Sequence, residues 1–172
     1  PAPGPTAGGG GSKAKPFGDP VSVRPNPLLG AGAGAEVTLE LWVANAKDML
    51  SGVFQLSFDP SVLQVADLAI NDIPGQILKS TGARLIISNE SYDNESGEIL
   101  VGVLAQQSGF EGVTGSGPFA RITFILRPNQ SGVTPVEFVA GDWSRIFVYR
   151  PGASPAEQED VLLLDGEITA GR

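Results

Sequence analysis

A regular alternation of apolar and polar side chains in residues 52–65 is the feature that most constrains how this chain can fold. Phe54, Leu56 and Phe58 occupy every second position, and successive side chains of a β-strand point to opposite faces. Asp59 and Pro60 then end the strand, because proline has no N–H for the ladder and aspartate caps turns with its side chain. This segment therefore predicts a strand with one face in a core and the other on a surface.

Further alternating segments follow at short intervals along the chain. The 23 glycines and 14 prolines interrupt it too often for long helices. We expect a short helical turn near residues 73–80 and a hairpin around the turn at residues 92–97. Many short strands at this spacing predict an all-β sandwich. The expected strands cover residues 21–23, 36–44, 62–70, 83–89, 99–105, 120–126, 134–139, 145–149 and 165–170, together with the segment around Phe54.

The composition excludes several classes of function. The chain has no histidine and no cysteine, which removes the commonest general base and metal ligand and every Ser-His or Cys-His nucleophilic arrangement. No other residues suggest a catalytic centre, so we expect no enzyme. A formal charge of −8 would repel nucleic acid. The apolar runs are far shorter than the roughly 20 residues of a membrane-spanning helix, so no membrane span is expected.

Residues 1–20 and residues 21–172 differ sharply in composition. The first segment is rich in proline and glycine and has almost no apolar side chains, which predicts a linker or tail. The second is expected to form one β-sandwich domain. Few lysines and many Gly, Ser, Thr and Asn residues favour an exported protein at the surface of a bacterium or outside it.

Three segments together resemble the cohesin family. They are the strand that ends at Asp59-Pro60, the Gly-rich loop at 105–117 that leads into a strand beginning Phe119-Ala120, and the closing segment 165–168. The resemblance extends over residues 21–170 and is strongest to cohesin-like domains of bacterial cell-surface and secretion-associated proteins. It implies a nine-stranded β-sandwich of jelly-roll topology, related in form to carbohydrate-binding modules.

The resemblance also implies a non-catalytic binding module, because cohesins bind a calcium-bearing dockerin on one sheet face. Val53 departs from cellulosomal cohesins, which often have acidic or amide groups at this position, and Gln106 stands where they have a carboxylate on the sixth strand. An apolar face with few charges suits a permanent contact better than a reversible one, which argues against a dockerin of the cellulosomal kind. The expected partner is a dockerin-like or another surface protein. Transferred to this chain, the expected face consists of Ser51, Val53, Gln55, Ser57, Val101, Val103, Ala105 and Gln106.

Two further sites are weighed against simpler interpretations. Asp93, Glu95 and Glu98 form an acidic turn that could bind calcium through oxygen ligands, although such clusters are more often solvated, and no other cofactor is expected. Trp42 lies on the outward face of its expected strand, which makes it a candidate interface aromatic, as is Trp143.

Two functions remain open at this point. The first is the interaction module, which docks its partner on the face around Val53. The second is a structural subunit that assembles with copies of itself into an extracellular filament or surface layer. In that case the 1–20 tail or a strand edge would join neighbours by β-augmentation.

Overall fold

The computed structural model describes residues 21–24, 28–32, 34–107, 109, 111–139, 144–149, 157–159 and 163–170. Within them the chain forms strands and one turn of 3-10 helix, η1 (Ile77–Lys79), so the all-β prediction is confirmed. The expected tail at residues 1–20 and Trp143 lie outside the described residues. The described part contains no helix long and apolar enough to cross a membrane.

Twelve strands are described, where the resemblance implied nine. The additional ones are short segments at the rims of the sheets, such as β2, β10 and β11. The strands are β1 (Val21–Arg24), β2 (Leu28–Ala31), β3 (Glu36–Phe58), β4 (Leu63–Ala69), β5 (Arg84–Asp93), β6 (Glu98–Gln106), β7 (Val113–Leu126), β8 (Gly132–Phe138), β9 (Arg145–Val148), β10 (Glu157–Glu159), β11 (Leu163–Leu164) and β12 (Gly166–Ala170).

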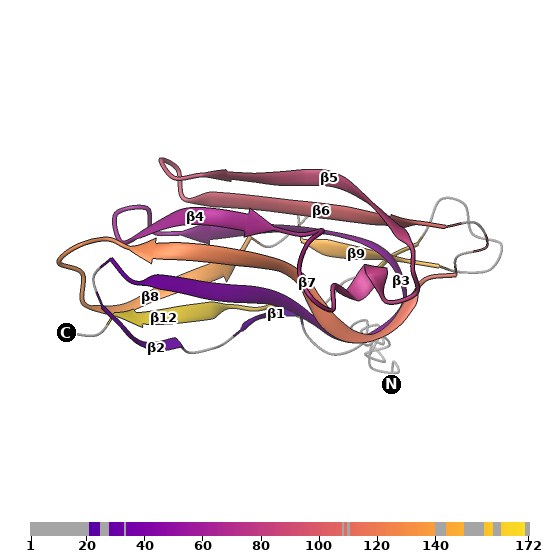
Figure 1. Cartoon of the computed structure of the whole chain (residues 1–172), viewed down its shortest axis with the longest axis horizontal. Helices are drawn as coiled ribbons and strands as arrows, with labels where there is room; N and C mark the ends of the chain where they lie inside the picture. Colours follow the sequence, from indigo (N-terminus) through magenta and orange to yellow (C-terminus); the bar gives the residue numbers. More distant parts are fainter. Residues whose placement is uncertain are drawn as a thin grey trace, which may run out of the picture.

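Two layers share the long strand β3 (Figure 1). In the first layer the order is β5, β6, the second half of β3, β9 and β10. In the second layer it is β4, β7, the first half of β3 and β1. The side of the sandwich is closed by β8 and β12, since β8 pairs with both β3 and β12 and β2 pairs with β12 in parallel.

β3 serves both layers because it bends in its middle. Asn45 and Asp48 adopt positive φ values of 47° and 54°, a conformation that asparagine and aspartate tolerate better than most residues. The register with β7 shifts on both sides of Ala46. The two strands expected at 36–44 and around Phe54 are therefore found in their places, joined into one element.

The Asp59-Pro60 turn has the structure that its sequence predicts. The backbone N–H and the hydroxyl of Ser61 donate to Oδ1 of Asp59 at 2.9 and 2.6 Å. The hydroxyl bond, then the backbone bond, lowers the pKa of Asp59, since both stabilise the carboxylate. Pro60 contributes its carbonyl, which accepts from Nε of Arg127 at 2.7 Å. The turn thus links the end of β3 to the end of β7.

The core lies between the two layers and is built from the inward residues of each strand. Phe54 contacts Phe119 edge to face at a centroid distance of 5.0 Å, and Phe58 contacts Phe124 at 5.4 Å. Both contacts join a β3 ring of the first layer to a β7 ring of the second. Aromatic packing therefore ties the layers together directly beneath the outward face of β3.

One buried polar side chain fixes the loop that contains η1. Gln76 accepts from the N–H groups of Leu78 and Lys79 at 2.7 and 3.2 Å and donates to the carbonyl of Phe119 at 3.2 Å. The first two bonds satisfy donors at the start of η1, where backbone N–H groups lack helical partners. The third attaches the loop to β7. The short helical turn expected near residues 73–80 is thus confirmed.

Candidate interaction surface

The outward face of the first layer is built from side chains that stand opposite one another on neighbouring strands. Across β3 and β6, Ser51 is opposite Leu104, and Gln55 is opposite Leu100. Across β5 and β6, Ile86 is opposite Leu104. Directly opposed residues share a face, so these positions belong to one surface.

The four expected β3 residues lie on this surface. Ser51, Val53, Gln55 and Ser57 are half-buried, while the intervening Phe54 and Leu56 are fully buried. The alternation of the sequence therefore places these side chains correctly. Their outward position is what the structure establishes, and their contact with a partner stays a prediction.

The predicted outward position is wrong for three of the β6 residues. Val101 is 0% exposed, and Val103 and Ala105 are also buried, so they belong to the core. In the register, Val101 stands opposite the buried Phe54. The outward positions of β6 are the even-numbered ones, and of the four expected residues Gln106 alone is exposed.

Period two explains the error. Residues 99–105 are apolar at every position except Gly102, so the β6 sequence does not reveal which set faces inward. Ala105 and Gln106 are adjacent and cannot both lie on one face of a regular strand. That parity was a signal in the sequence that the four predicted residues could not all share one face, although it did not show which set faces outward.

Sequence reasoning missed the outward residues of three strands. We call the outward surface of the first layer, with these residues included, the candidate face. It consists of Ser51, Val53, Gln55 and Ser57 of β3, Ile86, Ser88, Asn89 and Ser91 of β5, Leu100, Gly102, Leu104 and Gln106 of β6, and Arg145 and Phe147 of β9.

An apolar row crosses the candidate face. Ile86 and Leu104 are opposite each other and are 39% and 42% exposed. Ser51 follows on β3, and the half-buried Phe147 stands opposite it on β9. Large apolar side chains that gather on an exposed surface are typical of contact sites.

A β-bulge shapes the centre of the candidate face. The register between β5 and β6 shifts between Ile87 and Asn89, so Ser88 is the extra residue, and Asn89 stands opposite Gly102. A Cβ atom at Gly102 would come within 2.5 Å of the Ser88 hydroxyl and 2.9 Å of the Asn89 amide nitrogen. The small residue on β6 thus makes room for two polar side chains from β5.

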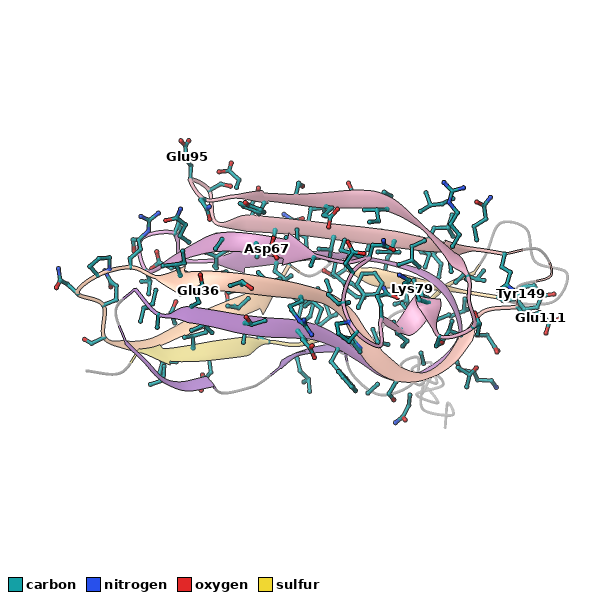
Figure 2. All side chains as sticks on the ribbon, in the orientation of Figure 1. Glu36, Asp67, Lys79, Glu95, Glu111 and Tyr149 are labelled. Carbon is teal, nitrogen blue, oxygen red and sulfur yellow. The ribbon has the colours of Figure 1, made fainter. Side chains whose placement is uncertain are left out.

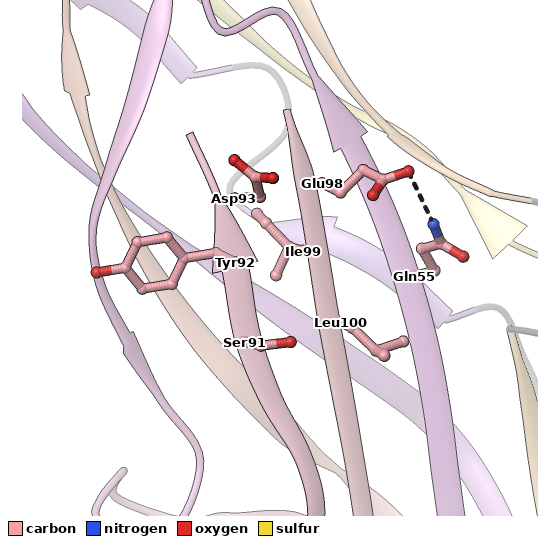
Figure 3. Close-up of a pocket in the computed structure, with 7 residues that line it drawn as sticks. All are labelled: Gln55, Ser91, Tyr92, Asp93, Glu98, Ile99 and Leu100. Atoms are coloured by element: carbon pink, nitrogen blue, oxygen red, sulfur yellow. Dashed lines mark hydrogen bonds between the residues drawn. The ribbon is translucent and has the colours of Figure 1, made fainter. Parts of the chain in front are cut away.

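The acidic residues lie at the end of the face near the β5–β6 turn. Asp93 Oδ1 accepts from the N–H groups of Glu95 and Ser96 at 2.7 and 3.3 Å. These bonds, the Glu95 bond first, lower the pKa of Asp93. Glu98 accepts from the amide of Gln55 at 3.5 Å (Figure 3). Four further residues, Ser91, Tyr92, Ile99 and Leu100, complete the lining of an open hollow of about 540 Å³.

The three residues of the calcium candidate do not form a metal-binding group in the structure. The described residues contain no group of three or more acidic side chains that could hold a metal ion. Asp93 caps the turn, whereas Glu95 extends from its tip (Figure 2) and Glu98 is directed toward β3 (Figure 3). The acidic sequence therefore builds a turn, which agrees with the simpler interpretation.

The second layer carries its polar groups in matched pairs. Glu40 and Arg121 are opposite each other on β3 and β7 and form an ion pair at 2.9 Å. The hydroxyls of Thr38 and Thr123 are also opposite and lie 3.2 Å apart. Trp42 is on the same outward side but half-buried, opposite Pro118, so its contact with a partner stays a prediction.

Solved structures with a similar fold include cohesins. The third cohesin of ScaC from Acetivibrio cellulolyticus, solved in complex with the ScaB dockerin, matches with a TM-score of 0.67 and 17% identity over 88% of this chain and 98% of that one. The chain has a cohesin-like fold. The OlpC cohesin of Clostridium thermocellum, also in a dockerin complex, matches this cohesin-like domain with a TM-score of 0.61 and 16% identity over 92% and 98%.

A cohesin outside the cellulosome is similar as well. The non-cellulosomal cohesin of the archaeon Archaeoglobus fulgidus matches with a TM-score of 0.51 and 15% identity over 89% of this chain and 91% of that one. No protein-family model and no curated protein sequence matches the chain. At such identities the likeness concerns the fold, and the predicted location at a bacterial surface stays a prediction.

Proposed function

We propose that this cohesin-like domain is a non-catalytic interaction module that docks a protein partner on the candidate face. The observation that carries the proposal is the uncovered apolar row of Ile86 and Leu104, which continues across β3 to Phe147. Burial of exposed apolar surface drives most protein association.

The contrast between the layers supports this choice of face. On the second layer, Glu40 and Arg121 satisfy each other within the chain. On the candidate face, the side chains around Leu104 are small, neutral or apolar, such as Ser51 and Gly102. The neutral patch around Leu104 can be covered without leaving a buried charge unpaired.

The partner that we propose is a dockerin-like domain or another protein of the bacterial surface. Support comes from the ScaC and OlpC cohesins, whose structures contain dockerins. The net charge of −8 disfavours nucleic acid as the alternative. An exported location, outside the cell or at its surface, is part of the same proposal.

Calorimetry with purified type I dockerins, beginning with the ScaB dockerin, tests the proposal. The variants are Leu104→Asp and Val53→Asp on the candidate face, and Gln64→Asp on the exposed side of β4 is the matched control. Hot-spot residues contribute about 2 kcal/mol or more, so each face variant should bind about thirtyfold more weakly. The control should bind like the unmodified chain.

Two results would contradict the proposal. If the face variants bound a dockerin as tightly as the unmodified chain does, the candidate face would be the wrong surface. If no dockerin of the panel bound the unmodified chain, dockerins would be the wrong class of partner. Circular dichroism of each variant would check that a loss of binding is not a loss of folding.

A self-assembling structural subunit is the second candidate function. The observation that favours it is the long edge strand β5, which pairs only with β6 in the described part of the chain. Electron microscopy and light scattering with and without residues 1–20 test this candidate. Ordered polymers that disappear on truncation would support it, and a chain that forms no polymers in either form would contradict it.

A further inference from the structure

The free edge of β5 is the strongest unexplained feature of the molecule outside the candidate face. β5 has ten residues and is the outermost strand of the first layer (Figure 1). Among the described strands it pairs with β6 alone. Its other edge presents backbone N–H and C=O groups, which can pair with a further strand.

The side chains of β5 are exposed on both sides of the strand. Ile87 and Tyr92, which stand opposite the buried Val103 and Ile99, are themselves 37% and 44% exposed. Tyr92 points past the edge of β5 and away from β6 (Figure 3). A further strand along this edge would cover apolar surface that the monomer leaves in water.

The edge of β4, the corresponding strand of the second layer, is treated differently. Oδ1 of Asn94 accepts from the N–H of Val65 at 2.7 Å, and its Nδ2 donates to the carbonyl of the same residue at 3.0 Å. One amide side chain thus occupies both hydrogen-bonding groups of Val65 and blocks further pairing there. No described side chain is hydrogen-bonded in this way to the backbone of residues 84–93.

The bulge makes β5 compatible with a second copy of itself. In antiparallel pairing, opposed residues share a face, and a two-fold axis perpendicular to the sheet preserves faces. Ser88 and Asn89 both lie over Gly102, on the outward face. If two copies of β5 pair with the two-fold axis between these residues, every outward residue of one copy therefore stands opposite an outward residue of the other. Ile86 would stand opposite Ser91 of the second copy, both on the outward face.

The charged residues at the two ends of β5 favour the same pairing register. With the centre between Ser88 and Asn89, Arg84 of one copy stands opposite Asp93 of the other, and symmetry gives this pair twice. Asp93 binds its turn through Oδ1, which leaves Oδ2 to accept from a guanidinium. Opposite charges on directly opposed residues stabilise strand pairing.

We propose that two copies of this chain pair through β5, antiparallel and about a two-fold axis perpendicular to the first layer. The two first layers then form one continuous sheet. Both candidate faces look to the same side of it, so the dimer presents two neighbouring docking surfaces. The pairing is independent of the proposed docking function, and only its use for bivalent binding rests on that function.

Because the chain has no cysteine, single cysteines provide a clean test. Ile86→Cys chains mixed with Ser91→Cys chains should form a disulfide-linked heterodimer, since directly opposed residues have Cα atoms about 5 Å apart. Ile86→Cys alone should link poorly, because its symmetry mate lies about 15 Å away at strand spacing. Gln64→Cys on β4, mixed with Ser91→Cys, is the matched control.

Sedimentation equilibrium of the full chain gives the second measurement. Arg84→Glu places like charges opposite each other twice and should raise the dimer dissociation constant by about tenfold. A monomer at all concentrations up to the millimolar range would overturn the proposal. Equal linkage of Ile86→Cys with itself and with Ser91→Cys would overturn the register.

Discussion

The outward surfaces of the two layers differ although the same strand, β3, contributes to both. Where β3 pairs with β7, its outward residues Thr38 and Glu40 have side-chain partners directly opposite. Where it pairs with β6, the outward Val53 faces Gly102 and Ser51 faces Leu104, which cannot pair in this way, and the bond from Gln55 to Glu98 lies at the end of the face. One surface is completed within the chain, and the other is left to be covered.

The difference teaches how a sandwich separates stability from binding. The inward residues of both layers are equally apolar and form one core. Matched polar pairs allow the second layer to stay in water. The first layer exposes Leu104 and Ile86 instead, a solvation cost that a binding partner would relieve.

The largest difference in stability is expected between substitutions on the two opposite faces of β6. Val101→Asp would bury an unpaired carboxylate in the core and should lower the free energy of unfolding by about 4 kcal/mol or more. Leu104→Asp, three positions away on the outward side, should change it by about 0.5 kcal/mol or less. Urea denaturation measures both. Equal destabilisation would show that our assignment of the two faces of β6 is wrong.

A smaller effect is expected at the centre of the candidate face. Gly102→Val would force its side chain against Ser88 and Asn89, and overpacking of this kind costs about 1–3 kcal/mol. The bulge of β5 should shift in response. Backbone amide NMR spectra would detect the shift at residues 86–91, and Gly32→Val, at a glycine with open space around it and no positive φ, controls for adding a side chain. An unchanged β5 would contradict the packing described for the bulge.

Substitutions on the outward surface of the second layer should change stability but not partner binding. The coupling energy between Glu40 and Arg121 should be about 0.2–1 kcal/mol, because the pair is partly exposed and directly cross-strand. A double-mutant cycle with Glu40→Ala and Arg121→Ala, measured by urea denaturation, gives this value. Dockerin binding should be unaffected in all three variants. A loss of binding would mean that the partner contacts the second layer.

The smallest expected effect is the loss of stability at low pH that comes from the β5–β6 turn. The folded-state pKa of Asp93 lies below its ordinary value of 3.8, because backbone N–H groups stabilise the carboxylate. Its contribution to stability is therefore present above pH 3.8 and is lost as the pH falls through the folded-state value. Asp93→Asn should make the free energy of unfolding depend less on pH between pH 5 and pH 2 than it does in the unmodified chain. Urea titrations at intervals of about 0.5 pH measure this dependence. An unchanged slope would mean that the turn does not depend on the charge.

Much of the fold could be predicted because the pattern of β3 is unambiguous. Val37, Leu39 and Leu41 are buried while Thr38 is exposed, as strict alternation requires. The Asp59-Pro60 turn is equally local, since Ser61 supplies its hydrogen bonds two residues away. Such features depend on neighbours in sequence, so they can be predicted without the fold.

The candidate site was only half predictable for the opposite reason. β6 is apolar on both faces, and its orientation depends on pairing with β3, which is far away in sequence, and on the layer that covers one of the two faces. The bulge at Ser88 reverses the phase of β5, which no local pattern reveals. Ile86 and Leu104 were therefore not among the predicted face residues, although they lie on the surface.

The sequence by itself determined the all-β class, the position of most strands and the inward residues of β3, because period two and turn chemistry act between neighbours in the chain. Only the tertiary structure decided which side of β6 faces solvent, that Asn94 blocks the edge of β4, and that β5 keeps a free edge. The reason is physical: a strand with two apolar faces gains its orientation from the layer that covers one of them, and that layer is assembled from distant segments.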